Sequence, residues 1–232
     1  MKTSAIVVAA GQGTRIGAAG GKAFIAIGGQ PMATYSLRTL SALSDLLSIV
    51  FVVGAGQDER AASTLSQYGP WPVPIHLARG GAERQDSVAA GLAAVDATAE
   101  LVIVHDAARP FVPLSCFEAC AAAAGSTGAA IVAVPAHDTV KVVNADGAIV
   151  ETLDRRTIWL AQTPQAFRTS LLRRAYEHAQ RDGYTATDDA MLVERIGATV
   201  RVVPGLSVNR KITTPDDLDW AEFLLQTQKL AD

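Results

Sequence analysis

The sequence predicts a single α/β domain with a mostly parallel sheet, helices on both faces of the sheet and a protruding β-hairpin arm. Short apolar runs rich in Val and Ile alternate with longer stretches of helical pattern along most of the 232 residues. These runs are continuously apolar, which is typical of strands buried on both faces of a sheet. The alternation favours parallel strands joined by helical crossovers. A chain of this length suits one domain spanning residues 1–232.

The predicted elements follow in chain order. Strands are expected at Ala5–Ala9, Ile49–Val53, Pro74–Ala78, Leu101–His105, Ala129–Val134 and Val200–Val203. Helices are expected at Pro31–Leu43, Gln57–Tyr68, Ser87–Val95, Leu114–Ala124, Ser170–Gln180 and Asp188–Ile196, and from Pro215 to about Gln228. The last helix has the clearest start, because Thr214 is a favourable N-cap and Pro215 suits the first helical position.

The segment 139–158 breaks this alternation. An Asp146-Gly147 pair separates two arms rich in valine and isoleucine, which predicts a β-hairpin. An isolated hairpin is marginally stable in water, so another surface must cover it. We expect an arm at about 137–160 that packs on a second subunit; the alternative is a hairpin folded over its own domain.

Composition narrows the function classes. The formal net charge of −3 argues against nucleic acid as a partner. No apolar run is long enough to span a membrane, and the apolar run at 5–10 is too short for a signal peptide. We therefore expect a cytoplasmic protein. Cys116 and Cys120 share a predicted helix face without nearby histidines, so both are interpreted as core residues.

A glycine-rich segment follows the first predicted strand, where residues 9–15 read AAGQGTR. Gly11 and Gly13 let backbone N–H groups approach a phosphate closely. Arg15 and Lys22 stand on either side of a glycine-rich loop, and such cations suit a triphosphate whose charge rises in the transition state. The alternative is an ordinary glycine-rich turn with solvated cations.

A dinucleotide-binding turn is a second alternative for this segment. It would need glycine at position 16, where Ile16 stands, and an acidic residue at the end of the second strand, where residues 53–56 read VGAG. Both departures argue against an NAD-dependent oxidoreductase.

Two further motifs lie at predicted strand ends. Asp106 and Arg109 follow the strand that ends at His105, and ligands of open α/β sheets bind at such ends. Asp106 could bind a metal–phosphate or a substrate hydroxyl, and Arg109 could hold a phosphate as a fork; a surface salt bridge is the alternative. His105 is interpreted as structural. The glycine pair at 80–81 and Ser87 could face the edge of a base, although a helix N-cap explains them equally well.

The remaining motifs are weak one by one and informative together. They read DRRTIW at 154–159, QTPQ at 162–165, TDD at 187–189 and NRKITTPDDL at 209–218. The last is mainly a helix-capping signature, which leaves Lys211 as its functional residue.

In this order and spacing, the motifs resemble those of the 2-C-methyl-D-erythritol 4-phosphate cytidylyltransferases. The resemblance covers nearly the whole chain and implies a Rossmann-like nucleotidyltransferase fold. It implies transfer of CMP from CTP to 2-C-methyl-D-erythritol 4-phosphate, giving 4-diphosphocytidyl-2-C-methylerythritol and pyrophosphate, in non-mevalonate isoprenoid biosynthesis. It also implies a homodimer joined by the hairpin arms and a Mg²⁺ ion held mainly by the triphosphate, with no protein metal ligands.

The resemblance also implies roles for residues. Those implied in catalysis are Arg15, Lys22, Arg155 and Lys211. Those implied in nucleotide binding are Ala10, Gly11, Gly13, Gly81, Ala82, Ser87 and Asp106. Those implied in binding the polyol phosphate are Asp106, Arg109, Thr139, Arg155, Thr163, Thr187 and Lys211, with Thr139 and Arg155 coming from the partner's arm.

The implied chemistry needs no general base, because the second pKa of a phosphate monoester is about 6 and the nucleophile is already mostly ionised. The sequence departs from the family pattern at Gly21, where proline is usual, and at Val208 and Arg210. We expect Gly21 to loosen its loop. A ribitol 5-phosphate cytidylyltransferase and a non-catalytic nucleotide-binding module remain alternatives.

Overall fold

The computed structural model describes residues 1–13, 16 and 20–227. Within them a seven-stranded sheet has the order β11-β7-β10-β6-β1-β4-β5. The strands are β1 (Thr3–Ala9), β4 (Leu46–Val53), β5 (Ile75–Arg79), β6 (Leu101–Asp106), β7 (Ala129–Pro135), β10 (Trp159–Arg168) and β11 (Arg201–Pro204). Six of them match the predicted strands, and every pairing outside β10 is parallel. The predicted, mostly parallel sheet is confirmed.

Strand β10 is the one member of this sheet that was not predicted. It pairs antiparallel with both β6 and β7, and its register shifts between Ala161 and Gln165. Its centre carries Gln162, Thr163 and Pro164, and a proline argues against a strand in the middle of a sheet. All three are nevertheless buried, and the side chains of Gln162 and Thr163 form hydrogen bonds under the functional site described below.

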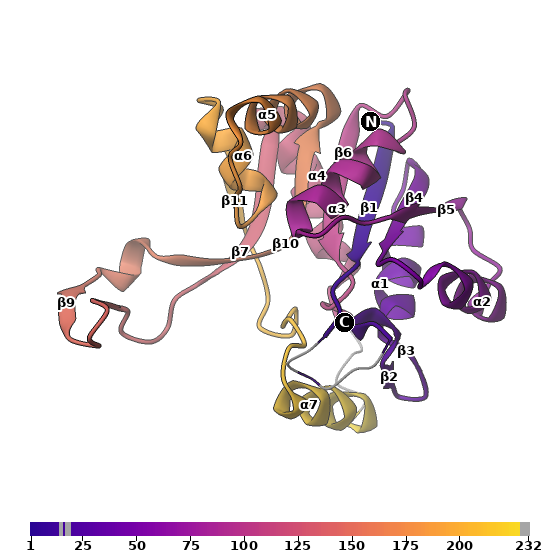
Figure 1. Cartoon of the computed structure of the whole chain (residues 1–232), viewed down its shortest axis with the longest axis horizontal. Helices are drawn as coiled ribbons and strands as arrows, with labels where there is room; N and C mark the ends of the chain where they lie inside the picture. The colour runs from indigo at the N-terminus through magenta and orange to yellow at the C-terminus, as the bar shows by residue number, and fades with distance from the viewer. Residues whose placement is uncertain (14–15, 17–19, 228–232) are drawn as a thin grey trace.

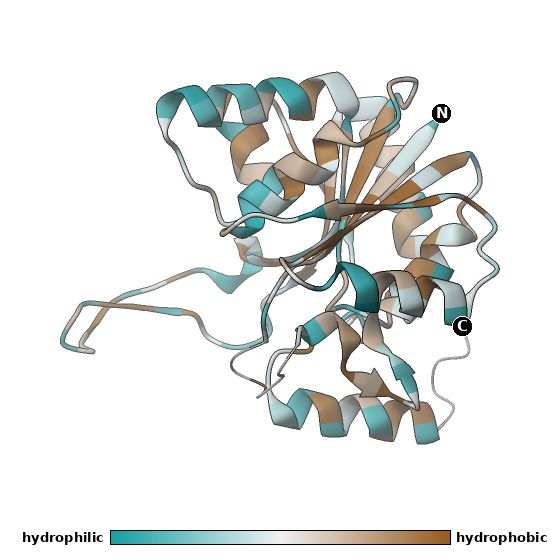
Figure 2. Ribbon diagram, turned by 45° about the vertical axis from the view of Figure 1, so that its right-hand side comes forward, coloured by the Kyte–Doolittle hydropathy of each residue, from teal (hydrophilic) through white to brown (hydrophobic). Residues whose placement is uncertain are grey.

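Helices cover both faces of the sheet, as predicted (Figure 1). They are α1 (Met32–Ser41), α2 (Asp58–Tyr68), α3 (Arg84–Ala93), α4 (Leu114–Thr127), α5 (Thr169–Asp182), α6 (Asp189–Arg195) and α7 (Pro215–Gln226). Alternate residues of β1 point to opposite faces, so Val7 packs with α1 and α4, whereas Ile6 packs with α3, α5 and α6. Figure 2 shows the apolar strands between these helices and the polar helix surfaces outside.

A small substructure below the sheet carries the C-terminal helix. Strands β2 (Ala26–Ile27) and β3 (Gln30–Pro31) form a short hairpin that was not predicted, preceded by the 3-10 helix η2 (Lys22–Phe24). Helix α7 packs against it, and Glu222 accepts a hydrogen bond from the backbone N–H of Gly28 at 2.9 Å. The N-terminal and C-terminal parts of the chain therefore meet here.

The predicted hairpin arm is present and projects from the body between β7 and β10 (Figure 1). Its strands are β8 (Lys141–Val143) and β9 (Ile149–Thr152), followed by the 3-10 helix η3 (Arg155–Thr157). Asn144 closes the turn by accepting hydrogen bonds from the N–H groups of Asp146 and Ala148. Val143, Ile149 and Val150 are 54%, 62% and 61% exposed, so the arm does not fold over its own domain. Among the described residues, none of the helices is long and apolar enough to cross a membrane.

Candidate active site

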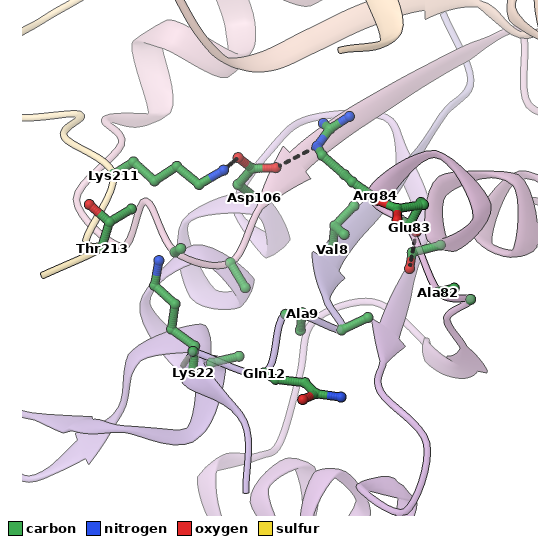
Figure 3. Close-up of a pocket in the computed structure, with 18 residues that line it drawn as sticks. Val8, Ala9, Gln12, Lys22, Ala82, Glu83, Arg84, Asp106, Lys211 and Thr213 are labelled. Atoms are coloured by element: carbon green, nitrogen blue, oxygen red, sulfur yellow. Dashed lines mark hydrogen bonds and ion pairs between the residues drawn. The ribbon is translucent and has the colours of Figure 1, made fainter. Parts of the chain in front are cut away.

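A cavity of about 310 Å³ opens at the C-terminal ends of β1 and β6 (Figure 3). The chain leaves β1 for β4 and β5 on one side and later returns to β6 on the other, and ligands of open α/β sheets bind at such a switch point. The walls are the loop after β1, the start of α3, the turn after β6 and the segment before α7. The described lining residues are Val8, Ala9, Ala10, Gly11, Gln12, Gly13, Lys22, Ala23, Gly81, Ala82, Glu83, Arg84, Ser87, Asp106, Ala107, Ala108, Lys211 and Thr213.

Asp106 lies at the centre of the charges in this cavity. One carboxylate oxygen lies 3.2 Å from Arg84 Nε, and the other accepts a hydrogen bond from Lys211 Nζ at 2.7 Å (Figure 3). Burial disfavours the charged carboxylate, but Arg84, Lys211 and Arg109 outweigh that effect and hold the pKa of Asp106 well below its usual range. Asp106 is therefore ionised at neutral pH and organises the cations instead of transferring protons.

A hydrogen-bonded chain beneath the cavity fixes the backbone of Asp106. The Asp106 N–H donates to Thr163 Oγ1 at 3.0 Å, and Thr163 Oγ1 lies 3.0 Å from His105 Nδ1. His105 Nε2 lies 3.2 Å from the Arg109 carbonyl, which can only accept, so Nε2 carries the ring proton and donates to it. In the neutral ring Nδ1 then accepts a hydrogen bond from the Thr163 hydroxyl. Burial is the largest cause that lowers the pKa of His105, to about 4. His105 is thus neutral, and it is not among the residues that line the cavity.

Lys211 reaches the cavity from a segment that hydrogen bonds hold to the sheet. Ile212 N–H donates to the Ala108 carbonyl at 2.8 Å, and the Asn209 side-chain amide donates to the Thr163 carbonyl at 2.8 Å. Arg109 Nη1 donates to the Asn209 carbonyl at 2.8 Å. Arg109 is therefore beside the cavity and is not among its lining residues; in this single chain its guanidinium supports the Lys211 segment.

Lys22 reaches the cavity from below Lys211 in the view of Figure 3, as the first residue of η2. Its N–H donates to the Gly11 carbonyl at 3.2 Å, which joins η2 to the loop after β1. Gly21 has a φ of 99°, which glycine adopts readily and proline cannot. A Cβ atom at Gly21 would also collide with the Gln57 side chain. Arg15 lies outside the described residues.

The residues predicted to bind the nucleotide lie together. The structure places Ala10, Gly11, Gly13, Gly81, Ala82, Ser87 and Asp106 around this one cavity. A Cβ atom at Gly80 would lie 2.6 Å from both Ala10 Cβ and Ser87 Oγ, so glycine lets the α3 loop approach the β1 loop. Backbone groups of two loops thus face one space, which suits recognition of a base and its phosphates.

Three predicted residues stay apart from the cavity in the single chain. Thr139 and Arg155 are on the exposed arm, where Arg155 donates to the His137 carbonyl at 2.6 Å. Thr187 is exposed just before α6. The two departures nearest Lys211 face α7 instead of the cavity, since Arg210 pairs with Asp217 at 2.8 Å and Val208 packs in the α7 cluster.

Sequence reasoning missed Arg84 and Thr213, which both line the cavity. Arg84 lies within the motif at 80–88, but the sequence gives no sign that its partner is Asp106, 22 residues further along. Within TDD at 187–189, only Thr187 was assigned a role. The buried member is Asp189, which forms an ion pair with Arg84 at 2.9 Å.

Comparison with known proteins adds to this geometry. The family described as 2-C-methyl-D-erythritol 4-phosphate cytidylyltransferase (IspD) matches residues 3–227. A curated enzyme of that name from Syntrophus aciditrophicus (strain SB) is 43% identical over 228 residues, which cover 98% of this chain and 97% of the relative. Another from Alkaliphilus oremlandii (strain OhILAs) is 39% identical over 228 residues, with the same coverage.

Solved structures show the same likeness. The 4-diphosphocytidyl-2C-methyl-D-erythritol synthase from Anaerococcus prevotii DSM 20548 aligns with a TM-score of 0.85 at 32% identity, over 97% of this chain and 98% of that chain. The 2-C-methyl-D-erythritol 4-phosphate cytidylyltransferase from Thermus thermophilus aligns with a TM-score of 0.79 at 35% identity, over 97% of this chain and 100% of that chain. This chain belongs to the 2-C-methyl-D-erythritol 4-phosphate cytidylyltransferase family.

Proposed function

We propose that the chain transfers CMP from CTP to 2-C-methyl-D-erythritol 4-phosphate and releases pyrophosphate. The observation that supports this most directly is the placement of Lys22 and Lys211 on different walls of one cavity, whose other walls are the backbone of two glycine-containing loops (Figure 3). Two anionic substrates can be bound there side by side. The product would be 4-diphosphocytidyl-2-C-methylerythritol, an intermediate of non-mevalonate isoprenoid biosynthesis.

The reaction is a single displacement at phosphorus. An ionised oxygen of the polyol phosphate attacks the α-phosphorus of CTP. The bond from that phosphorus to the oxygen bridging to the β-phosphate breaks, and pyrophosphate leaves with the electron pair. The protein must hold two anions in line and neutralise the charge that develops between them. Lys22 and Arg15 are proposed to stabilise the α-phosphate, while Lys211 and Arg109 orient the polyol phosphate.

Asp106 determines where one of these cations lies. Its ionised carboxylate holds the Lys211 ammonium at 2.7 Å, so Lys211 is in place before substrate binds. Such preorganised charge costs no rearrangement during the reaction. Thr163 contributes indirectly, because its hydroxyl accepts the N–H of Asp106.

Mg²⁺ is the proposed cofactor, and the lining residues fit an ion that arrives with the triphosphate. The carboxylates of the lining are Glu83 and Asp106, and Mg²⁺ sites in nucleotide enzymes combine one or two carboxylates with phosphate oxygens. In the part of the chain that the structure describes, no three His, Cys, Asp or Glu side chains form a metal-binding group. The triphosphate would hold the ion, since both oxygens of Asp106 are already paired with Arg84 and Lys211, and the ion would neutralise phosphate charge.

We further propose a cytoplasmic homodimer in which each arm completes the partner's site. The exposed apolar residues of β8 and β9 support this, because an uncovered apolar hairpin is unstable in water. Thr139 and Arg155 on the arm would then reach the partner's polyol phosphate. Thr187 would lie at the edge of the same substrate site.

The test is release of pyrophosphate with CTP and Mg²⁺, comparing 2-C-methyl-D-erythritol 4-phosphate with ribitol 5-phosphate. We expect fast release with the methylerythritol phosphate and slow release with the ribitol phosphate. The opposite preference would keep the chemistry and change the substrate. No release with either compound, together with tight CTP binding by calorimetry, would indicate a nucleotide-binding module.

A further inference from the structure

A buried carboxylate lies behind the cavity, outside the residues assigned to the reaction. Asp189, the first residue of α6, has a side chain that is 1% exposed. One of its oxygens accepts a hydrogen bond from the Tyr176 hydroxyl of α5 at 2.5 Å, and the other lies 2.9 Å from Arg84 Nη1. Burying a charge is costly unless it is paired, and here Arg84 and the Tyr176 hydroxyl supply that pairing.

Arg84 connects this carboxylate to the cavity. Its guanidinium presents Nη1 to Asp189 at 2.9 Å. Its Nε faces Asp106, and Lys211 holds the other oxygen of Asp106 (Figure 3). Burial disfavours the charged guanidinium, but Asp189 and Asp106 outweigh it and raise the pKa of Arg84. Each residue of one continuous chain of contacts therefore touches the next: Tyr176, Asp189, Arg84, Asp106 and Lys211.

Asp189 cannot easily follow a movement of Arg84, because α6 is fixed to the sheet. Gln165 of β10 accepts the N–H groups of Asp189 and Ala190 at 3.2 Å each, and its own amide donates to Asp188 at 2.9 Å. The same strand holds Thr163, which accepts the backbone N–H of Asp106. The backbone of Asp106 and the partner of Arg84 are thus both held by one strand.

We propose that Asp189 is a positioning residue that acts through Arg84 and Asp106 to hold Lys211 in the polyol-phosphate half of the cavity. The identity of the substrate rests on the proposed function, whereas the route from Asp189 to Lys211 rests on the contacts of Asp189, Arg84 and Asp106. With Asp189 neutralised, Arg84 can turn its fork of two N–H groups onto Asp106 and compete with Lys211 for the carboxylate. Lys211 then loses its fixed position.

The test is the nearly isosteric variant Asp189→Asn in the full chain with CTP and 2-C-methyl-D-erythritol 4-phosphate. We expect kcat/KM for the polyol phosphate to fall about tenfold or more, with a raised KM for that substrate and a KM for CTP within about threefold of the wild type. A purely structural role would reduce the active fraction and leave both KM values unchanged, which would overturn the proposal.

A double-mutant cycle tests the route of the effect. If Asp189 acts through Arg84, then Asp189→Asn in an Arg84→Met background should lower kcat/KM by less than about twofold further. A full tenfold loss in that background would show that Asp189 acts independently of Arg84. The matched control is Asp182→Asn, which removes a carboxylate between the same helices, where Asp182 pairs with Arg195 at 3.2 Å on the surface. It should leave kcat/KM unchanged.

Two measurements keep the inference separate from the proposed substrate. If the wild type turns over neither polyol phosphate, the proposed function fails. A crystal structure of Asp189→Asn then decides the inference. A displaced Arg84 and a longer Asp106–Lys211 distance support it, and unchanged positions of these side chains overturn it.

If Asp189→Asn does not fold, Tyr176→Phe removes one hydrogen bond to the same carboxylate. It should shift the polyol-phosphate KM in the same direction, and wild-type kinetics would contradict the proposal.

Discussion

At the scale of single residues, burial and neighbouring charges decide whether a titratable side chain is ionised at neutral pH. Asp106 and His105 are neighbours in sequence, yet one is ionised and the other neutral at pH 7. Asp106 faces cations on three sides, whereas His105 lies against the Phe117 ring with centroids 5.0 Å apart and uses both ring nitrogens in hydrogen bonds. The pair shows why residue type alone does not identify an acid–base catalyst.

The neutral His105 predicts a specific dependence of stability on pH. Its folded pKa of about 4 lies below the ordinary value of 6.5, so as pH falls the unfolded chain takes up a proton first. The contribution of His105 to the free energy of unfolding is therefore fully present above pH 6.5. It is lost between pH 6.5 and 4 and amounts to about 3 kcal/mol. The free energy of unfolding, measured with urea across this pH range, should depend less steeply on pH in His105→Gln than in the wild type. His76 is exposed, so His76→Gln should keep the wild-type dependence on pH. The same dependence in all three proteins would contradict a neutral, buried His105.

The residues that the sequence identified are those whose signal is local. Gly11 and Lys22 flank one loop, and Lys211 stands out within a helix-capping motif. Arg84 and Asp189 were missed because their contacts are distant in sequence. Arg84 pairs with Asp106 and Asp189, which lie 22 and 105 residues further along the chain, so only the folded sheet brings the three together. Arg109 was identified, but its contacts with Asn209 could not be deduced from its motif.

At the scale of elements, the strands buried on two faces were predictable and the strand carrying polar residues was not. The valine and isoleucine of β1, β4 and β6 are recognisable because mainly apolar contacts surround them. Strand β10 instead buries Gln162, Thr163 and Gln165, whose partners come from β6, α6 and the Lys211 segment. A strand stabilised by tertiary hydrogen bonds has no pattern of its own to detect.

Helix α2 is predicted to act on catalysis without lining the cavity. Arg60 donates to the carbonyls of Gly20 and Phe24, each at 3.1 Å, and its guanidinium lies 5.1 Å from the centre of the Phe24 ring. It therefore holds both ends of the segment that carries Lys22.

Arg60→Lys should test that contribution, because a single ammonium cannot reproduce a planar fork that reaches two carbonyls. We expect kcat to fall about tenfold while the free energy of unfolding changes by less than about 1 kcal/mol, since Arg60 is exposed. Arg38→Lys on α1, whose guanidinium lies over Tyr68, is the matched control. Unchanged turnover in Arg60→Lys would show that the segment holds its shape without this clamp.

At the scale of the whole molecule, the arm is the feature that a single chain leaves unexplained. The body buries its apolar residues between helices and sheet, while Trp159 and Leu160 at the start of β10 and the valines of the arm remain exposed. Two-fold oligomers present the same surface on each subunit, so the exposed apolar residues of one copy can pack against those of the other. The arrangement would also bring Arg155 to a second site.

Mixed dimers test whether arms cross between subunits. Lys22→Ala alone should lower kcat by about two orders of magnitude, as loss of a transition-state donor does, and Arg155→Ala should impair each site that its arm serves. In a heterodimer of the two variants, crossing arms leave one site with both Lys22 and Arg155 intact. Equal amounts refolded together should then recover about a quarter of the wild-type turnover, because half of the random dimers are mixed and each has one intact site. If each arm serves its own subunit, every site carries one defect, and the mixture would be no more active than the average of the separate variants.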